Sequence, residues 1–335
     1  METDLFCEFR PFWRNPHLLT IAANFWPRSI DRRRFPAVRK EYRIARGITI
    51  IGFEHLPDIP ARGEIVLLHG LEGSADSGYM ASFAQQALER GFAVHRLNMR
   101  TCGDTERYCE TMYHSGLTSD TKEILRRLAR EGRGPLFLIG FSLGGNVALK
   151  LAAEFCETNF LAGVVAVSTP IDLAEAARAI GKPCNVLYAR RFLRSLCSRV
   201  RRMNEIAPDL YSIQGLDQVK TIWEFDDRFT APLFGFGTAA NYYHTQSAAR
   251  LLHAIRVPAL LIAAKDDPLV PFEIYDLPVF QTNSALRLLA AERGGHLGFL
   301  SRSSPRFWVD HVALNWIDEL LNTGCPALQR GALYG

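Results

Sequence analysis

The stretch Gly140-Phe141-Ser142-Leu143-Gly144-Gly145 decides how this chain of 335 residues is expected to fold. The residues before it, 135–139, are almost wholly apolar and predict a buried parallel strand. The residues after it, 146–153, are strong helix formers with an apolar face. A serine on such a strand-to-helix turn has a strained backbone that directs its hydroxyl out of the sheet. The stretch therefore predicts a serine nucleophile, and the alternative is a glycine-rich turn with a solvated serine.

Strands and helices alternate on both sides of this turn. The expected strands are 64–68, 92–97, 135–139, 161–168, 258–264 and 285–290, and the expected helices are 80–90, 119–131, 146–153 and 307–321. Such alternation predicts an α/β fold in which helices cover both faces of a mostly parallel sheet. An alternating segment at 43–54 predicts an edge hairpin before it.

Two segments depart from the alternation. Residues 172–256 contain several predicted helices and no convincing strand, which predicts a helical cap over the carboxyl edge of the sheet. Residues 1–45 contain four prolines and are expected to be irregular and to pack on the main domain. The chain is expected to form one domain over 1–335, with this N-terminal segment and the cap as its additions.

The composition is that of an ordinary globular protein, with 48% hydrophobic and 22% charged residues. A net charge of +4 is too small to indicate a nucleic-acid partner. Seven scattered cysteines without a Cys-x-x-Cys pair predict free thiols in a reducing compartment. The acidic N-terminus lacks the features of a signal peptide, and no apolar run approaches the ~20 residues of a membrane span. A cytoplasmic protein is the expectation.

A serine nucleophile needs a base, and the base needs an acid that orients it. In α/β folds with a serine turn of this kind, the order along the chain is serine, acid, histidine. Asp266 and Asp267 follow a late predicted strand, and His296 follows the last one. Asp267 is preferred over Asp266 because it lies four residues before Pro271, a common setting for the acid. The alternatives are a turn or helix cap for the aspartates and a flexible loop for His296.

The negative oxygen that forms during acyl transfer needs hydrogen-bond donors. One expected donor is the backbone N–H of Leu143, directly after the nucleophile. The second is expected from the loop after an early strand, where Gly70 allows a turn and Leu71 presents its N–H. His69, in the same loop, is expected to hold the loop and not to act as a catalytic base.

Taken together, these motifs resemble the YheT-like group of α/β-hydrolases, which is related to bacterial YheT hydrolases and eukaryotic ABHD lipases. The matching stretches are 15–20, 69–80, 98–103, 113–116, 140–145, 224–226, 242–243, 266–268 and 294–296. The resemblance implies an α/β-hydrolase fold and a serine carboxylic-ester hydrolase with Ser142, Asp267 and His296 as its charge relay. Leu19 stands where relatives usually carry Gln, a change outside the triad that bears on packing or substrate entry.

Arginines gather within a predicted cap helix that also carries apolar positions such as Phe192 and Leu196. The arginines are Arg190, Arg191, Arg194, Arg199, Arg201 and Arg202. One interpretation is a peripheral contact with the anionic inner membrane surface, which would suit a lipid substrate. The other interpretation, which we prefer, is a solvated basic face packed on the core through its apolar side.

The expected function is hydrolysis of carboxylic esters, either short- to medium-chain acyl esters or lipids, through an acyl-enzyme on Ser142. His296 serves as the base and Asp267 as the orienting acid, and no metal or other cofactor is required. Two alternatives remain open. One is transfer of the acyl group to an alcohol or lysolipid, and the other is a hydrolase-like binding protein without activity.

Overall fold

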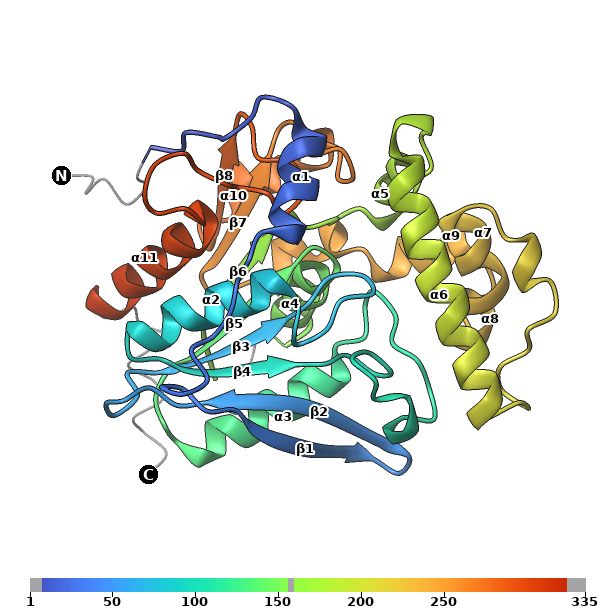
Figure 1. Ribbon diagram of the computed structural model, residues 1–335, viewed down its shortest axis with the longest axis horizontal. Helices are drawn as coiled ribbons and strands as arrows, with labels where there is room; N and C mark the ends of the chain where they lie inside the picture. Colours follow the sequence, from blue (N-terminus) through green and yellow to red (C-terminus); the bar gives the residue numbers. More distant parts are fainter. Residues whose placement is uncertain (1–7, 156–159, 324–335) are drawn as a thin grey trace.

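An eight-stranded sheet forms the centre of the computed structural model, which describes residues 8–155 and 160–323 (Figure 1). The strand order is β1-β2-β4-β3-β5-β6-β7-β8. The strands are β1 Val38–Ala45, β2 Ile48–His55, β3 Glu64–Leu68, β4 Ala93–Leu97, β5 Leu136–Phe141, β6 Leu161–Val167, β7 Ala259–Ala264 and β8 Leu286–Ala291. The pairs β1/β2 and β2/β4 are antiparallel, and the other neighbours are parallel. The predicted α/β fold with a mostly parallel sheet is confirmed.

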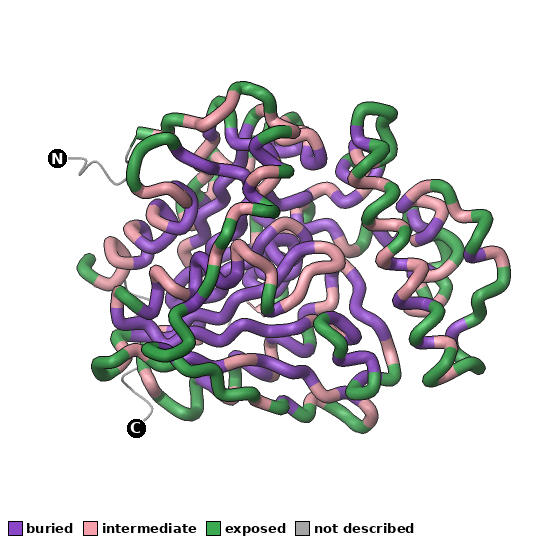
Figure 2. The backbone as a smooth tube through the Cα atoms, viewed as in Figure 1, coloured by how far each residue is buried: buried purple, intermediate pink, exposed green. Residues whose placement is uncertain are grey.

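Helices cover both faces of the sheet because alternate side chains of each strand point to opposite faces. On β3, Ile65 and Leu67 pack in one apolar cluster with α2 (Gly78–Glu89) and α11 (Trp308–Asn322). Val66 and Leu68 pack in a second cluster with α3 (Ser119–Glu131) and α4 (Leu143–Glu154). Figure 2 shows the central strands buried between these layers.

The carboxyl ends of three central strands meet at one edge of the sheet. The last residue of β3, Leu68, is paired with Gly140 of β5, and Gly140 is paired with Ala166 near the end of β6. The strand predicted at 135–139 therefore continues to Phe141, directly before Ser142. Ligands of open α/β sheets bind at this carboxyl edge.

The segment between β6 and β7 is helical, and we refer to its residues 172–256 as the cap. Every residue from 168 to 258 is described, and none of them belongs to a strand. The elements are α5 Leu173–Ile180, η2 Pro183–Asn185, α6 Val186–Ile206, η3 Leu216–Gln218, α7 Ile222–Phe225, η4 Asp226–Thr230, α8 Ala231–Leu233, α9 Ala239–Gln246 and η5 Ala248–Ala254. In Figure 1, α6 runs along the side of the cap that faces the sheet's carboxyl edge. Outside the cap, short helices are η1 Glu106–Tyr108, η6 Phe272–Tyr275 and α10 Val279–Thr282.

The N-terminal segment is more regular than its prolines suggest. Residues 16–25 form helix α1 (Pro16–Phe25), and β1 already begins at Val38, so the expectation of an irregular 1–45 is corrected. Pro16 occupies the first turn, where its missing N–H costs no hydrogen bond. The Asn15 side chain caps this turn by accepting from the N–H groups of His17 and Leu18. A proline that would break a helix interior therefore starts this one.

Candidate active site

Ser142 forms the turn between β5 and α4. Its backbone has φ 52° and ψ −121°, a region that non-glycine residues rarely occupy. Its N–H donates to the carbonyl oxygen of Val167 at 2.8 Å, which ties the turn to β6. A Cβ on Gly140 would lie 2.2 Å from the Gly144 carbonyl oxygen, and one on Gly144 would lie 2.5 Å from that of Leu68. The glycines are thus required by close backbone approach on both sides of the serine.

The structure brings Ser142, His296 and Asp267 together in a hydrogen-bonded chain. The distance from His296 Nε2 to Ser142 Oγ is 3.0 Å, and that from His296 Nδ1 to Asp267 Oδ2 is 2.9 Å. The other oxygen of Asp267 accepts from the N–H groups of Leu269 and Val270 at 2.9 and 3.0 Å. Because the aspartate can only accept, Nδ1 carries the proton and Nε2 presents its lone pair to the serine hydroxyl.

Asp266, the other aspartate considered from the sequence, has a different contact. Its Oδ1 accepts from the N–H of Gly295 at 2.9 Å, and burial raises the pKa of its carboxyl. Gly295 has φ 61°, so this contact holds the backbone directly before His296. Asp266 therefore supports the loop after β8 that carries His296, which we call the histidine loop, whereas Asp267 contacts the imidazole itself.

The histidine loop has one further support that the sequence did not reveal. The His296 N–H donates to Thr20 Oγ1 at 2.9 Å, across a separation of 276 residues. A Cβ on Gly295 would lie 2.6 Å from the Pro16 carbonyl oxygen, so α1 packs directly against this loop. The available signal was the matching stretch at 15–20, which ends in Thr20, but it carried no indication of its spatial neighbour. Leu19, in the same stretch, is buried beside Leu300.

The loop after β3 lies against the serine. A Cβ on Gly70 would lie 3.1 Å from Ser142 Cβ, a tight contact that glycine avoids. The Gly70 N–H donates to the Tyr79 hydroxyl at 2.9 Å. Within the described residues, neither the N–H of Leu71 nor that of Leu143 donates to a protein acceptor. Both predicted oxyanion donors therefore remain available beside the nucleophile.

His69 fixes this loop from the core side. Its Nδ1 lies 2.8 Å from the Gly70 carbonyl oxygen, and its Nε2 accepts from the Met99 N–H at 3.0 Å. Nδ1 is therefore the protonated nitrogen. Burial lowers the pKa of His69 to about 4, so the ring stays neutral near pH 7. The structure thus gives His69 the loop-holding position that the sequence predicted.

Two cavities meet at the Ser142 hydroxyl. The first is largely apolar, with an empty volume of about 810 Å³, and the second, of about 1470 Å³, has many polar and charged side chains. Both are lined by Leu71, Ser142, Phe192, Leu269 and His296. We refer to them as the apolar cavity and the polar cavity. An ester bound at Ser142 could place its two halves in different surroundings.

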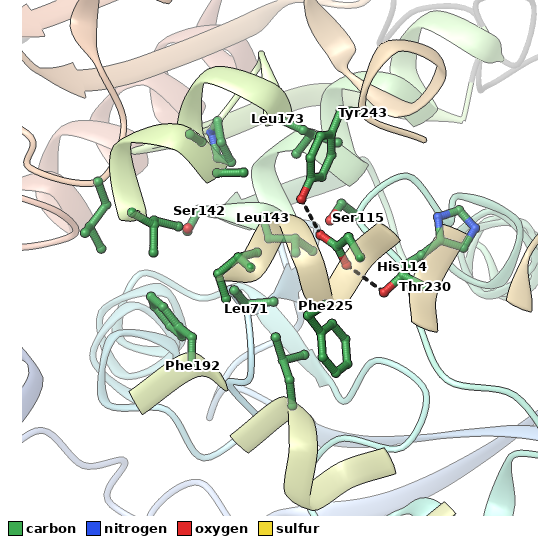
Figure 3. A pocket seen from close by; sticks show the side chains of 18 of the residues that line it. Leu71, His114, Ser115, Ser142, Leu143, Leu173, Phe192, Phe225, Thr230 and Tyr243 are labelled. Atoms are coloured by element: carbon green, nitrogen blue, oxygen red, sulfur yellow. Dashed lines mark hydrogen bonds between the residues drawn. The ribbon is translucent and has the colours of Figure 1, made fainter. Parts of the chain in front are cut away.

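The cap supplies much of the apolar cavity. Leu173, Ala176, Ala177 and Ile180 line it at helical spacing along α5, and Phe192 and Leu196 line it from α6. Figure 3 shows Leu173, Phe192 and Leu71 around the same space as Ser142.

A polar group interrupts the apolar lining away from the serine. Asp226 accepts hydrogen bonds from Thr230 Oγ1 and from the Tyr243 hydroxyl, both at 2.6 Å, and these are the dashed lines in Figure 3. Burial raises the pKa of Asp226 to about 6. The cavity is therefore apolar near Ser142 and polar around this carboxyl group.

The basic helix predicted from the sequence is α6, and part of its charge is paired. Arg199 contacts Glu72, Arg201 contacts Asp217, and Arg202 contacts Glu106. The interpretation of all six arginines as one solvated face is therefore corrected, because Arg199 is buried. Arg190, Arg191 and Arg194 are exposed and form no ion pair with a described residue.

Comparison with known proteins identifies relatives of this chain. A family model described as the alpha/beta hydrolase fold matches residues 64–303. The chain is 29% identical over 323 residues to a candidate esterase, YheT of Escherichia coli (strain K12), with 94% of each chain covered. It is 27% identical to a monoacylglycerol lipase of Saccharomyces cerevisiae, covering 74% of this chain and 57% of the relative. It is 26% identical to the phospholipase ABHD3 of Mus musculus, covering 80% and 66%.

Among solved structures, an esterase of Pyrococcus furiosus has a similar fold. Its TM-score is 0.57 at 16% identity, with 95% of this chain and 98% of the esterase covered. A 2,6-dihydroxy-pseudo-oxynicotine hydrolase has a TM-score of 0.59 at 20% identity, covering 92% and 72%. At this level of identity the likeness concerns the fold alone.

Proposed function

The chain belongs to the alpha/beta hydrolase fold family, and from this premise we propose that it is a serine enzyme that cleaves carboxylic esters. Relatives named as an esterase, a monoacylglycerol lipase and a phospholipase support ester hydrolysis. The observation that carries the proposal is the hydrogen-bonded chain from Asp267 through His296 to Ser142, at the point where two cavities meet.

In the proposed mechanism, Ser142 Oγ attacks the ester carbonyl while His296 Nε2 takes the hydroxyl proton. Asp267 holds Nδ1–H and stabilises the imidazolium that forms. The N–H groups of Leu71 and Leu143 donate to the developing oxyanion. His296 then returns its proton to the leaving alcohol, and an acyl group stays on Ser142. Water, deprotonated by His296, attacks this acyl-enzyme and releases the carboxylic acid.

The two cavities support a division of the substrate. We assign the acyl chain to the apolar cavity, because burying methylene groups there gains about 0.8 kcal/mol each. We assign the alcohol half to the polar cavity, whose lining includes Arg28, Ser74 and Asp104. The substrate class is therefore an acyl ester of a polar alcohol. Acylglycerols and glycerophospholipids have this form, in keeping with the names of the relatives.

We also propose that the protein makes a peripheral contact with a lipid surface. Apolar side chains are exposed on α1 and at the start of α6, with Phe25 at 76% and Leu187 at 68%. His17 and Tyr188 stack and bring these two helix segments together, and Tyr188 also lines the polar cavity. Exposed apolar side chains flanked by unpaired arginines suit an anionic lipid surface. No helix in 8–155 or 160–323 is long and apolar enough to cross a membrane.

Replacement of the nucleophile tests the proposal. We expect Ser142→Ala to lower the kcat for p-nitrophenyl butyrate by at least ~10⁴-fold. A fluorophosphonate probe should label the parent at Ser142 and leave the variant unlabelled. Ser303→Ala, at an exposed serine outside both cavities, serves as the control and should match the parent in both assays. Parental turnover by Ser142→Ala would disprove the mechanism.

A further inference from the structure

Glu72 adopts a backbone conformation that usually belongs to glycine. Its φ is 55°, and it follows Leu71 directly in the loop that lies against Ser142. The Gly73 N–H donates to the Gly70 carbonyl oxygen at 3.0 Å, so residues 70–73 form a β-turn. Glu72 occupies the third position of this turn, where a positive φ favours glycine. Strain of this kind is unfavourable and persists only where neighbouring groups hold it.

The Glu72 side chain is held by three other residues. Its carboxylate accepts from Arg199 Nε and Nη2, both at 3.0 Å, from the Tyr113 hydroxyl at 2.9 Å, and from Ser195 Oγ. The Tyr113 oxygen in turn accepts from the Glu72 backbone N–H at 3.0 Å. The side chains of Arg199 and Glu72 are 5% and 4% exposed. Burial alone would raise the pKa of Glu72, but Arg199 and the hydrogen bonds from Ser195 and Tyr113 together lower it and keep the carboxylate ionised.

These contacts connect the loop after β3, which carries the proposed oxyanion donor Leu71, to the cap. Ser195 and Arg199 lie one turn apart on α6, and Phe192 and Leu196 on the same stretch of this helix line the apolar cavity. The helix that contacts the assigned acyl site therefore also holds the turn next to the nucleophile.

The direction of the Leu71 N–H depends on this turn. The N–H belongs to the same rigid peptide unit as the Gly70 carbonyl, which points away from it. That carbonyl oxygen is held by His69 and by the Gly73 N–H, and the second bond closes the turn whose third residue, Glu72, is held through its side chain. Anchoring Glu72 thus stabilises the turn that holds the Gly70–Leu71 peptide, which carries the proposed donor.

We propose that Glu72 and Arg199 are positioning residues, which hold the Leu71 N–H toward the oxyanion of the transition state. The inference rests on the proposed function, since it requires that Ser142 be the nucleophile and Leu71 a donor. Donors that are preorganised in this way need no rearrangement during the reaction. The competing explanation is a purely structural role, in which the Glu72–Arg199 pair only holds the cap against the rest of the domain.

Two matched controls separate these explanations. Arg201 lies on the same helix and pairs with Asp217 within the cap, away from the loop. Tyr211 joins the cap to the body through a 2.8 Å hydrogen bond from the Met112 N–H, again without touching the loop. If the Glu72–Arg199 pair only fastens α6 or the cap, then Arg201→Met and Tyr211→Phe should affect turnover as Arg199→Met does.

The experiment measures kcat and KM for p-nitrophenyl octanoate, together with inhibition by an octyl trifluoromethyl ketone. This ketone forms a tetrahedral adduct with a serine and places an oxyanion where the transition state has one. We expect Glu72→Gln and Arg199→Met to lower kcat and the affinity for the ketone by ~10²-fold. KM and the affinity for octanoate should change less than ~3-fold. Arg199→Lys keeps the charge but not the two-nitrogen contact of the guanidinium with the carboxylate. Its kcat and its affinity for the ketone should be about tenfold higher than those of Arg199→Met.

Thermal unfolding of each variant shows whether it is folded. Parental kcat and ketone affinity in Glu72→Gln and Arg199→Met, with Ser142→Ala inactive, would overturn the inference and leave the proposed function standing. Equal losses in Arg201→Met or Tyr211→Phe would overturn it in favour of the structural role. Parental activity of Ser142→Ala would reject the proposed function and this inference with it. If the glutamate variant does not fold, Arg199→Lys and Arg199→Met decide the question.

Discussion

Backbone strain and hydrogen bonding at single residues define the site. Ser142 and Glu72 have φ values of 52° and 55°, and they lie in the loops that follow β5 and β3 at the carboxyl edge of the sheet. Neither conformation is favourable in isolation, at about 1–3 kcal/mol each. Each is held by contacts from distant parts of the chain, namely Val167 for Ser142 and Arg199 for Glu72. The sheet and the cap therefore maintain a local geometry that the loop alone would not keep.

The two neighbouring aspartates should differ sharply in their effect on turnover. We expect Asp267→Asn to lower kcat by ~10⁴-fold, because an amide at this position favours the tautomer with its proton on Nε2. That tautomer cannot accept the serine proton. Asp266→Asn should lower kcat less than ~10-fold, since Asp266 contacts the backbone N–H groups of Gly294 and Gly295 and not the imidazole. Steady-state kinetics on p-nitrophenyl butyrate provide the comparison, and a larger loss in Asp266→Asn would contradict the assignment.

At this scale the sequence supplied residue types and their order, but not their contacts. The order of Ser142, Asp267 and His296 along alternating strands predicted a common edge, because parallel strands end together. The sequence left Asp266 and Asp267 open, since adjacent residues share the same loop and only side-chain direction distinguishes them. Thr20 was not identified because its contact with His296 spans 276 residues and depends on how α1 packs.

At the scale of elements, periodicity predicted the core well and the N-terminus poorly. Helix α3 begins at Ser119 and ends at Glu131, as expected, because its apolar spacing is regular and Gly132 follows in a left-handed conformation. Helix α1 was not predicted, because proline was read as a helix breaker although Pro16 starts a helix. The arginines of α6 show a similar limit of prediction from the sequence. Their charge suggested one exposed face, whereas Arg199 pairs with a carboxylate from a loop 127 residues earlier.

The face of α5 that lines the apolar cavity should control acyl length. Ala177 lies on this face and is buried. We expect Ala177→Leu to reduce kcat/KM for p-nitrophenyl decanoate about tenfold relative to p-nitrophenyl butyrate, since added methyl groups occupy space needed by the longer chain. The ratio of the kcat/KM values for the two esters, measured in one preparation, does not depend on how much of the variant is folded.

Glu175→Leu is the matched control for this helix. Glu175 is exposed on the opposite side of α5, so its replacement should leave the ratio unchanged. Equal losses with both esters in Ala177→Leu would contradict the assignment of the acyl chain to the apolar cavity.

For the molecule as a whole, the exposed apolar side chains of α1 and the start of α6, namely Leu18, Phe25 and Leu187, form a proposed lipid-binding face that predicts selective association with anionic vesicles. We expect the protein to float with phosphatidylcholine vesicles that contain 30% phosphatidylglycerol, and less with phosphatidylcholine alone. Leu18→Asp and Leu187→Asp place charges on this face and should abolish flotation. Their turnover of soluble p-nitrophenyl butyrate should remain parental, because neither side chain lines a cavity.

Ile59→Asp is the control for this surface. Ile59 is 59% exposed, but it precedes β3 and therefore lies at the amino edge of the sheet, opposite the site. Its replacement should leave flotation unchanged. Flotation that is equally strong without phosphatidylglycerol, or equally lost in Ile59→Asp, would reject the proposed face.

His69, in the loop after β3, should contribute to the pH dependence of global stability. The folded pKa of His69 is about 4, below the 6.5 of an unfolded histidine, because burial disfavours the charged ring. The contribution of neutral His69 to the free energy of unfolding is therefore complete above pH 6.5 and is lost as the pH falls toward 4. Burial lowers the pKa of His114 to about 3, which acts in the same direction. Asp226 and Asp310, each raised to about 6 by burial, act in the opposite direction over the same range.

Because these groups oppose one another, the pH profile of the parent alone would not isolate His69. A comparison with His69→Gln does, since the other groups titrate in both proteins. We expect the free energy of unfolding lost in this variant to be ~2 kcal/mol larger at pH 7.5 than at pH 5.0, from 1.5 pH units at about 1.4 kcal/mol each. Urea unfolding at both pH values measures it. His253→Gln, at an exposed histidine, should show no such difference. An equal loss at both pH values would mean that folding does not lower the pKa of His69, so that the folded protein would hold it protonated at pH 5.0, where its Nε2 could not accept from Met99.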